Sequence, residues 1–198
     1  MRAAFLRSCM AGAAVLAAFA ALGDQPAQPD ISVHVEKAGD RVLVRVSLLV
    51  ETSPERAWSV LTDYDHMSRF VSNVHSSTVL SRSGNTLEVA QKGKASRGPL
   101  SISFDNVREV VLVPGREIRS RMIRGDLKSS EFTTRIAPEG SGTRVVNEGE
   151  FIPDRWVPPF VGPALIEAET RKQWQELREE MLRRQGAPAA DAVTGAQR

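Results

Sequence analysis

Apolar and polar residues alternate along residues 42–50 (VLVRVSLLV) with a strict period of two. This period predicts a β-strand with one buried face. A shorter alternation over residues 31–37 precedes it, and the turn-forming sequence Ala38-Gly39-Asp40 lies between the two. The pattern therefore predicts a β-hairpin near the start of the domain.

The segment SPERAWSVLTDYDHMSRFV (residues 53–71) changes the period and predicts two short helices. Ser53 is a good N-cap and Pro54 fits the first helical position. The sequence TDYD interrupts the apolar stripe, and Asp63 and Asp65 are each expected to cap the new turn. We expect this pair of helices to close the end of a hollow.

Strand patterns return after this segment, and turn residues recur between them. Because the connections are short, neighbouring strands are expected to be antiparallel and to form a meander. The predicted strands cover residues 74–82, 86–96, 100–113, 116–124, 128–137 and 143–151.

From Pro163 onward apolar residues recur every three or four positions, which predicts an amphipathic helix of about 20 residues that ends at Gly186. Residues 186–198 have little to bury and are expected to be a disordered tail. The order of elements predicts an α+β fold with a curved antiparallel sheet of seven or eight strands around one long helix, over residues 31–185.

The N-terminal residues 1–23 have the pattern of a cleaved signal peptide: basic residues, an alanine-rich apolar run from Met10 to Leu22, and small residues before Asp24. The alternative, a membrane anchor, needs about 20 apolar residues, which is more than this run supplies. Residues 24–30 are expected to be a short leader, and the mature protein is expected in the periplasm or outside the cell.

Removal of this segment changes the charge balance. The chain has 26 basic and 24 acidic residues, and loss of Arg2 and Arg7 leaves the two signs equal. No basic excess then remains to favour nucleic acid. The single cysteine, Cys9, is also removed, so we expect no disulfide and no cysteine-ligated metal site.

The segment Val50–Val74 resembles the START-like superfamily, and in particular its polyketide cyclase/dehydrase and coenzyme Q-binding branch. Gly125-Asp126, the sequence GTRV at 142–145 and the proline-rich approach to the last helix extend the resemblance over residues 31–184. Ser72 departs from the pattern, because proline is usual there. The resemblance implies a helix-grip fold whose cavity, between sheet and helix, holds a lipid, isoprenoid, polyketide or other hydrophobic molecule.

The predicted inner face of the sheet agrees with a cavity. It is mostly apolar, yet it carries several polar residues of the same parity: Gln91, Ser120, Ser130, Thr134 and Asn147. A solid core rarely contains so many polar groups, whereas a ligand pocket combines apolar walls with a few of them. The alternative is that a bulge near Asn106 shifts the parity and turns these residues toward solvent.

We therefore expect a hydrophobic ligand to contact walls from the sheet and the long helix, with Phe70 at the floor. The candidate ligand-binding residues are Tyr64, Phe70, Gln91, Phe104, Met122, Phe132, Thr134, Asn147, Trp156, Phe160, Ile166, Thr170 and Trp174. Trp156 and Phe160 belong to the apolar, proline-rich segment 151–165, which is either a lid or a loop packed permanently on the core. As a lid it would bring both rings to a membrane interface in transient contact.

The evidence for catalysis is weaker. His34 is expected to face solvent, Asp63 and Asp65 are better explained as caps than as metal ligands, and no cofactor motif occurs. A basic stripe at Arg119 and Arg121 is expected to be solvated. Noncatalytic ligand binding is the preferred hypothesis. The alternatives are a cyclase-, dehydrase- or hydrolase-type enzyme that uses His66 or Tyr64, and an envelope interaction module with a filled core.

Overall fold

The computed structural model describes residues 31–97, 100–154 and 162–185. In this part of the chain one eight-stranded sheet has the order β1-β2-β8-β7-β6-β5-β4-β3, and all neighbouring strands are antiparallel. The predicted hairpin and meander are confirmed. The strands are β1 (Ile31–Ala38), β2 (Arg41–Val50), β3 (Val74–Ser83), β4 (Thr86–Arg97), β5 (Leu100–Val113), β6 (Glu117–Gly125), β7 (Leu127–Glu139) and β8 (Gly142–Pro153).

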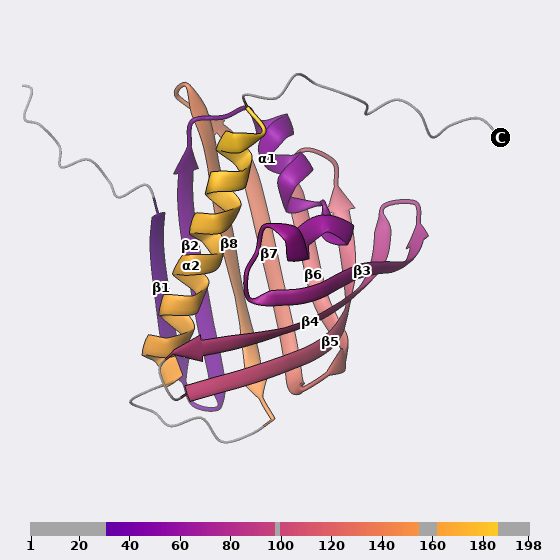
Figure 1. The fold of residues 1–198 in the computed structure, drawn as a ribbon, viewed down its shortest axis with the longest axis vertical. Coiled ribbons are helices and arrows are strands. Elements are labelled where there is room, and N and C mark those ends of the chain that lie inside the picture. Colours follow the sequence, from indigo (N-terminus) through magenta and orange to yellow (C-terminus); the bar gives the residue numbers. More distant parts are fainter. Residues whose placement is uncertain (1–30, 98–99, 155–161, 186–198) are drawn as a thin grey trace, which may run out of the picture.

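The chain crosses the hollow of the sheet between β2 and β3. β2 pairs with β1 and β8, whereas β3 is the edge strand at the opposite side of the sheet. The connection is made by the helix α1 (Pro54–Leu61) and the 3₁₀-helix η1 (Tyr64–Arg69). Figure 1 shows both lying over the concave face near one end of β6 and β7. The prediction of two short helices is therefore confirmed.

The two helices begin in different ways. The hydroxyl of Ser53 accepts a hydrogen bond from the N–H of Arg56 at 3.3 Å, as expected of an N-cap. Asp63 precedes η1 but makes no side-chain cap, and Asp65 accepts a hydrogen bond from the N–H of Val79 at 2.8 Å instead. The prediction that these aspartates cap the second helix is wrong, because both carboxylates bind partners distant in the sequence.

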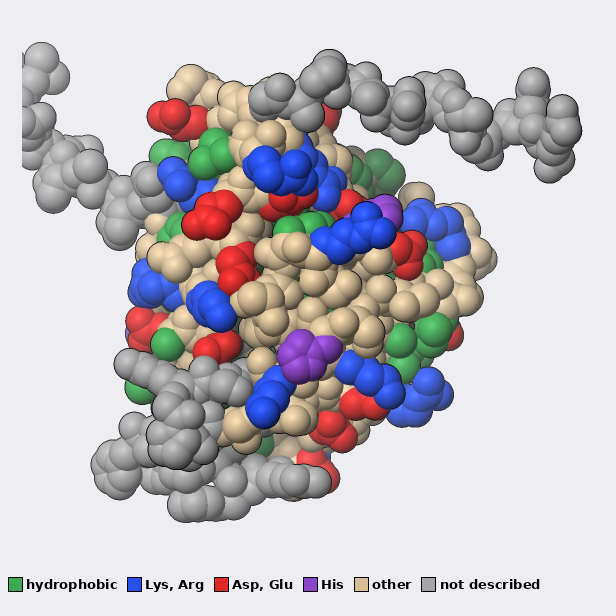
Figure 2. All heavy atoms as spheres, viewed as in Figure 1, with side chains coloured by type: hydrophobic (Ala, Val, Ile, Leu, Met, Phe, Trp, Pro, Cys, Tyr) green, Lys and Arg blue, Asp and Glu red, His purple; other side chains and the backbone are tan. Residues whose placement is uncertain are grey.

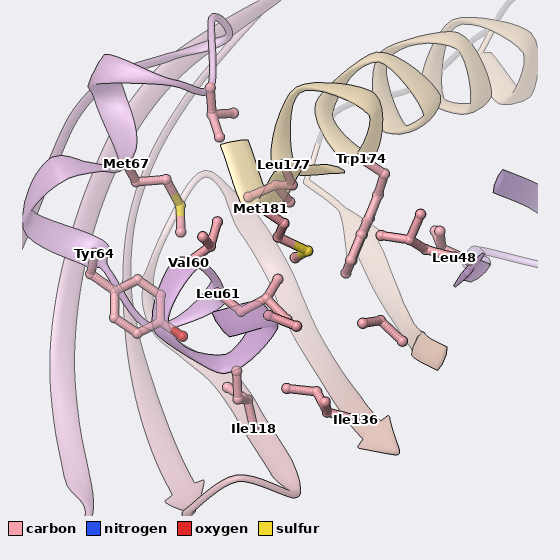
Figure 3. Close-up of a cluster of buried hydrophobic side chains, with 14 of the residues drawn as sticks. Leu48, Val60, Leu61, Tyr64, Met67, Ile118, Ile136, Trp174, Leu177 and Met181 are labelled. Atoms are coloured by element: carbon pink, nitrogen blue, oxygen red, sulfur yellow. The ribbon is translucent and has the colours of Figure 1, made fainter. Parts of the chain in front are cut away.

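The long helix α2 (Gly162–Arg183) lies along one side of the sheet (Figure 1). It packs mainly against β1 and also contacts β2, β4 and α1. Trp174, Leu177 and Met181 of α2 are buried, and Figure 3 shows them facing Leu48 and α1. Burial of these large side chains fixes the helix on the sheet.

Charges of both signs are interspersed on the surface (Figure 2). On the outer face of the sheet Arg119 pairs with Glu117, and Arg121 pairs with Glu109 at 2.9 Å. The arginine stripe is therefore neutralised by carboxylates on its own and the neighbouring strand. His34 is exposed on this same face, as predicted.

An ionic cluster joins the C-terminal end of α2 to the start of η1. Glu180 is only 6% exposed and accepts hydrogen bonds from Arg183 and Arg184. Arg184 also donates to Asp63 at 2.7 Å, and its guanidinium lies 5.3 Å from the ring centre of Phe70. The hydrogen bonds from Arg183, together with those from Arg184, lower the pKa of the Glu180 carboxyl although burial opposes this.

We predict that Glu180→Gln lowers the free energy of unfolding at neutral pH by about 1–3 kcal/mol, because it removes charge-assisted hydrogen bonds from a buried acceptor. A carboxyl whose pKa is lower in the folded state stabilises the fold above its unfolded-state pKa. The contribution is lost as the pH falls through the folded-state pKa. Urea unfolding measured from pH 7 down to pH 3 should show the gap between variant and wild type closing at acid pH.

The matched control is Glu179→Gln, which removes an exposed carboxylate from the neighbouring position. It should change stability by less than about 0.5 kcal/mol. Equal effects of the two substitutions at pH 7 would contradict the assignment.

Candidate functional site

A cavity of about 360 Å³ lies between the concave face of the sheet and α2. Ligand pockets commonly span about 300–1,000 Å³. Side chains of α1 and η1 close part of it, and the strands β2–β8 supply the remaining walls with α2. The lining residues are Val44, Leu61, Tyr64, Met67, Val74, Gln91, Phe104, Asn106, Arg108, Ile118, Ser120, Leu127, Ser130, Phe132, Thr134, Asn147, Phe151, Ile166, Thr170, Gln173, Trp174 and Leu177.

Most of the predicted binding residues reach this cavity. Those on its walls are Tyr64, Gln91, Phe104, Phe132, Thr134, Asn147, Ile166, Thr170 and Trp174. Ser120 and Ser130 also line it, so every polar residue predicted on the inner face lies there. The register between β5 and β6 shifts at Val107–Arg108, where Ile123 of β6 is skipped. This bulge comes after Ser120, so it does not turn the predicted polar residues toward solvent.

Two predicted wall residues are placed elsewhere. Phe70 follows the end of η1, and its ring packs against the core beneath Arg184. The pairing between β6 and β7 ends at Arg121, which is paired with Glu131. Met122 comes directly after this last pair, where β6 is no longer paired with β7. Neither residue lines the cavity. Trp156 and Phe160 lie outside the described residues, and so does the central part of the proposed lid.

Glycines make room for the aromatic walls. Phe104 is paired with Gly93 on β4, and Phe132 is paired with Gly149 on β8. A Cβ atom at Gly93 would lie 2.3 Å from the Phe104 ring, and one at Gly149 would lie 2.5 Å from the Phe132 ring. Each ring therefore lies over the backbone of the facing strand, which is possible only because the partner has no side chain.

Hydrogen bonds hold the polar wall residues in place. Asn147 donates from Nδ2 to the Thr134 hydroxyl at 2.8 Å, between directly paired residues of β8 and β7. Gln91 donates from Nε2 to the Ser77 hydroxyl at 2.9 Å, and both residues are buried. These bonds fix the amide orientations.

Arg108 is the only formal charge on the cavity wall among the described residues. Its Nη2 donates a hydrogen bond to Gln91 Oε1, whereas its buried Nε has no partner. Burial lowers the pKa of the Arg108 guanidinium and raises the pKa of the nearby Tyr64 phenol. The sequence analysis missed Arg108 and Asn106, although both share the inward parity of Phe104 on β5.

His66 does not reach the cavity. Its Nδ1 lies 2.7 Å from Asp63 Oδ1, and half of its side chain is exposed. Tyr64, which lies earlier on the same short helix, does line the cavity. The structure therefore does not bring together the two residues considered for an enzyme.

Ser72 joins the segment between η1 and β3 to α2. Its N–H donates to Glu176 Oε2 at 2.9 Å, and its hydroxyl donates to Glu176 Oε1 at 2.6 Å. A proline, usual at this position in the pattern that the sequence resembles, has neither donor. Ser72 therefore forms two hydrogen bonds with Glu176 of α2 that a proline at this position could not form.

The described part of the chain has neither a cluster of metal-ligating residues nor a helix suited to the membrane. No group of three or more His, Cys, Asp or Glu residues there could hold a metal ion. Within the same ranges no helix is long and apolar enough to span a bilayer.

The fold and the cavity define a protein of the START-like, helix-grip class. Residues 41–182 match the family described as polyketide cyclase/dehydrase and lipid transport, and the chain belongs to this family. No curated protein sequence matches the chain.

Solved structures share the fold at low sequence identity. A STAR-related lipid transfer protein fragment from Xanthomonas axonopodis has a TM-score of 0.65 at 13% identity, covering 78% of this chain and 95% of that one. The Zhui aromatase/cyclase from Streptomyces sp. R1128 has a TM-score of 0.63 at 15% identity, covering 74% and 97%. A protein from Thermus thermophilus has a TM-score of 0.61 at 22% identity, covering 71% and 97%.

We predict that Gly149→Ala destabilises the protein by about 1–3 kcal/mol, because overpacking forces the backbone or the Phe132 ring to move. The new Cβ would lie 2.2 Å from the Glu131 carbonyl oxygen. Urea unfolding measures the change. The control is Gly84→Asn at a turn with φ of +56° and no atom within 4 Å of the added Cβ, because asparagine tolerates this backbone conformation. A Gly149→Ala variant as stable as the wild type would contradict the close approach.

Proposed function

We propose that the protein binds a hydrophobic lipid-like, isoprenoid or polyketide-like molecule in the cavity between sheet and α2, without chemical conversion. The observation that carries the proposal is the cavity itself, whose walls are mostly apolar and include the rings of Phe104, Phe132 and Trp174. Membership of a family described by both cyclase/dehydrase and lipid transport supports a hydrophobic ligand.

The energetics allow useful affinity. A ligand that buries on the order of 300 Å² of apolar surface gains about 7 kcal/mol at roughly 25 cal/mol per Å². The loss of ligand freedom and the ordering of side chains offset part of this gain.

The titratable groups on the wall favour binding over catalysis. A general acid or base works best with a pKa near the working pH. Tyr64 and Arg108 are the only titratable side chains among the described lining residues. The wall therefore carries no carboxylate, imidazole, amine or thiol in the described part of the chain. The Tyr64 pKa is raised by burial, so its phenol stays protonated at neutral pH. The enzyme alternative keeps Tyr64 as its strongest candidate, and loss of turnover in a folded Tyr64→Phe variant would favour it.

The first test is native mass spectrometry with lipid extraction on the mature protein purified from its own host. We expect a co-purifying hydrophobic molecule that is absent from Phe132→Asp, because a carboxylate on the wall opposes apolar burial. The matched control is Thr133→Asp on the neighbouring, outward-facing position of β7, which should retain the ligand. A folded Phe132→Asp variant that binds normally would refute the assignment of the wall.

A second pair of variants guards against misfolding. Thr170→Trp fills the cavity from α2, and Lys172→Trp places the same ring on an exposed position of the helix. Only the first should reduce ligand uptake. An apo mass in the wild type, with no uptake from a panel of lipids and quinones, would favour a filled-core interaction module.

We propose that this binding occurs after export, with residues 1–23 removed. The basic N-terminus, the apolar run and the small residues before Asp24 support the proposal. Intact-mass analysis of protein from the periplasmic fraction should give a chain that begins at Asp24. A full-length chain found only in the cytoplasmic fraction would refute export.

A further inference from the structure

The wall of the cavity holds a cation that no acidic residue of the described chain neutralises. Arg108 on β5 lines the cavity, and its Nε is buried although the residue as a whole is partly exposed. Among the described residues, the one hydrogen-bond acceptor of Arg108 is the neutral amide oxygen of Gln91. Its Nε is buried without a partner.

This arrangement differs from the arginines on the outer surface. Arg41 pairs with Glu150 at 2.7 Å, and Arg121 pairs with Glu109 at 2.9 Å. Those pairs are exposed to water, which would solvate either partner alone. A buried charge without a counterion is far more costly, so an empty cavity leaves Arg108 in an unfavourable state.

The neighbouring groups orient the guanidinium without neutralising it. Gln91 is anchored by its donation to Ser77, which directs its oxygen toward Arg108. Tyr64 supplies a phenol that burial keeps protonated, so it does not act as the missing anion. In the described part of the chain Gln91 is the one hydrogen-bond acceptor of the guanidinium, and its Nε keeps an unused N–H donor.

Asn106 adds a second polar group without a partner. It lies two residues before Arg108 on the same strand face, lines the same cavity, and has a buried amide oxygen with no hydrogen bond. Rotation of this amide by half a turn presents its NH₂ group instead, since the two orientations occupy the same space. Arg108 and Asn106 together then offer several N–H donors to one acceptor group.

We propose that the ligand is an anionic amphiphile whose carboxylate pairs with Arg108 and accepts a hydrogen bond from Asn106. The inference rests on the proposed ligand-binding function and names the chemical class of the ligand. A carboxylate matches the planar guanidinium fork and supplies the missing charge. The hydrophobic body then extends past Phe104 and Phe132 toward Ile166 on α2.

The test compares dodecanoic acid with dodecanol, which has the same chain length and no charge at pH 7.5. Isothermal titration calorimetry should show at least tenfold tighter binding of the acid by wild-type protein. Arg108→Gln should remove this preference, so that the variant binds acid and alcohol with affinities equal to within about threefold. Arg121→Gln, on the outer face, is the matched control and should keep the preference.

A thermal scan without ligand tests the variant itself. Replacement of an uncompensated buried charge should leave the melting temperature of Arg108→Met equal to or above that of the wild type. The acid should raise the wild-type melting temperature by more than dodecanol does, and it should raise that of Arg108→Met by no more than dodecanol does.

The outcomes separate the two proposals. Equal affinity of the wild type for acid and alcohol, or a preference that survives Arg108→Gln, would overturn the anionic ligand and keep the hydrophobic site. Absence of binding of both probes by folded wild-type protein would overturn the site for single-chain amphiphiles and the carboxylate assignment with it.

Discussion

One helix cannot cover an eight-stranded sheet, and the remaining architecture follows from this mismatch. Strands lie about 4.8 Å apart and a helix with its side chains is about 10–12 Å wide, so one helix covers two or three strands. The helix α2 packs mainly on β1 and β2, at one edge of the sheet. The sheet is curved, and α1 and η1 close part of the hollow on its concave face that α2 does not cover (Figure 1).

The inward-facing residues of β2 differ in polarity from those of β7 and β8. Under α2, the inward positions of β2 are all valine or leucine, and none is more than 5% exposed. On β7 and β8 the inward positions include Ser130, Thr134 and Asn147, which line the cavity. Tight apolar packing thus dominates on β2, although Val44 also lines the cavity, whereas β7 and β8 supply a wall with several polar residues.

The sequence predicted the framework well because period-two patterns and short turns are local signals. All eight strands, both short helices and the long helix were found, and the inward parity placed Gln91, Thr134 and Asn147 correctly. Arg108 has the same parity as Phe104 but was missed, because a charged residue is normally assigned to the solvent side. The capping prediction for Asp63 and the wall prediction for Met122 failed for another reason. Their positions depend on contacts with distant elements, which no local pattern encodes.

The neutral amide side chains of Gln91 and Asn106 line the same cavity as Arg108 and leave its positive charge without a counterion. Gln91 is the neutral counterpart of glutamate, and a glutamate at this position would form an internal ion pair with Arg108. Such a pair would remove both the burial cost and the ability to attract an external anion. The amide of Gln91 holds the guanidinium in place and leaves its charge uncompensated. With the anionic ligand proposed above, the burial cost that the empty protein carries is recovered when the ligand's carboxylate pairs with Arg108.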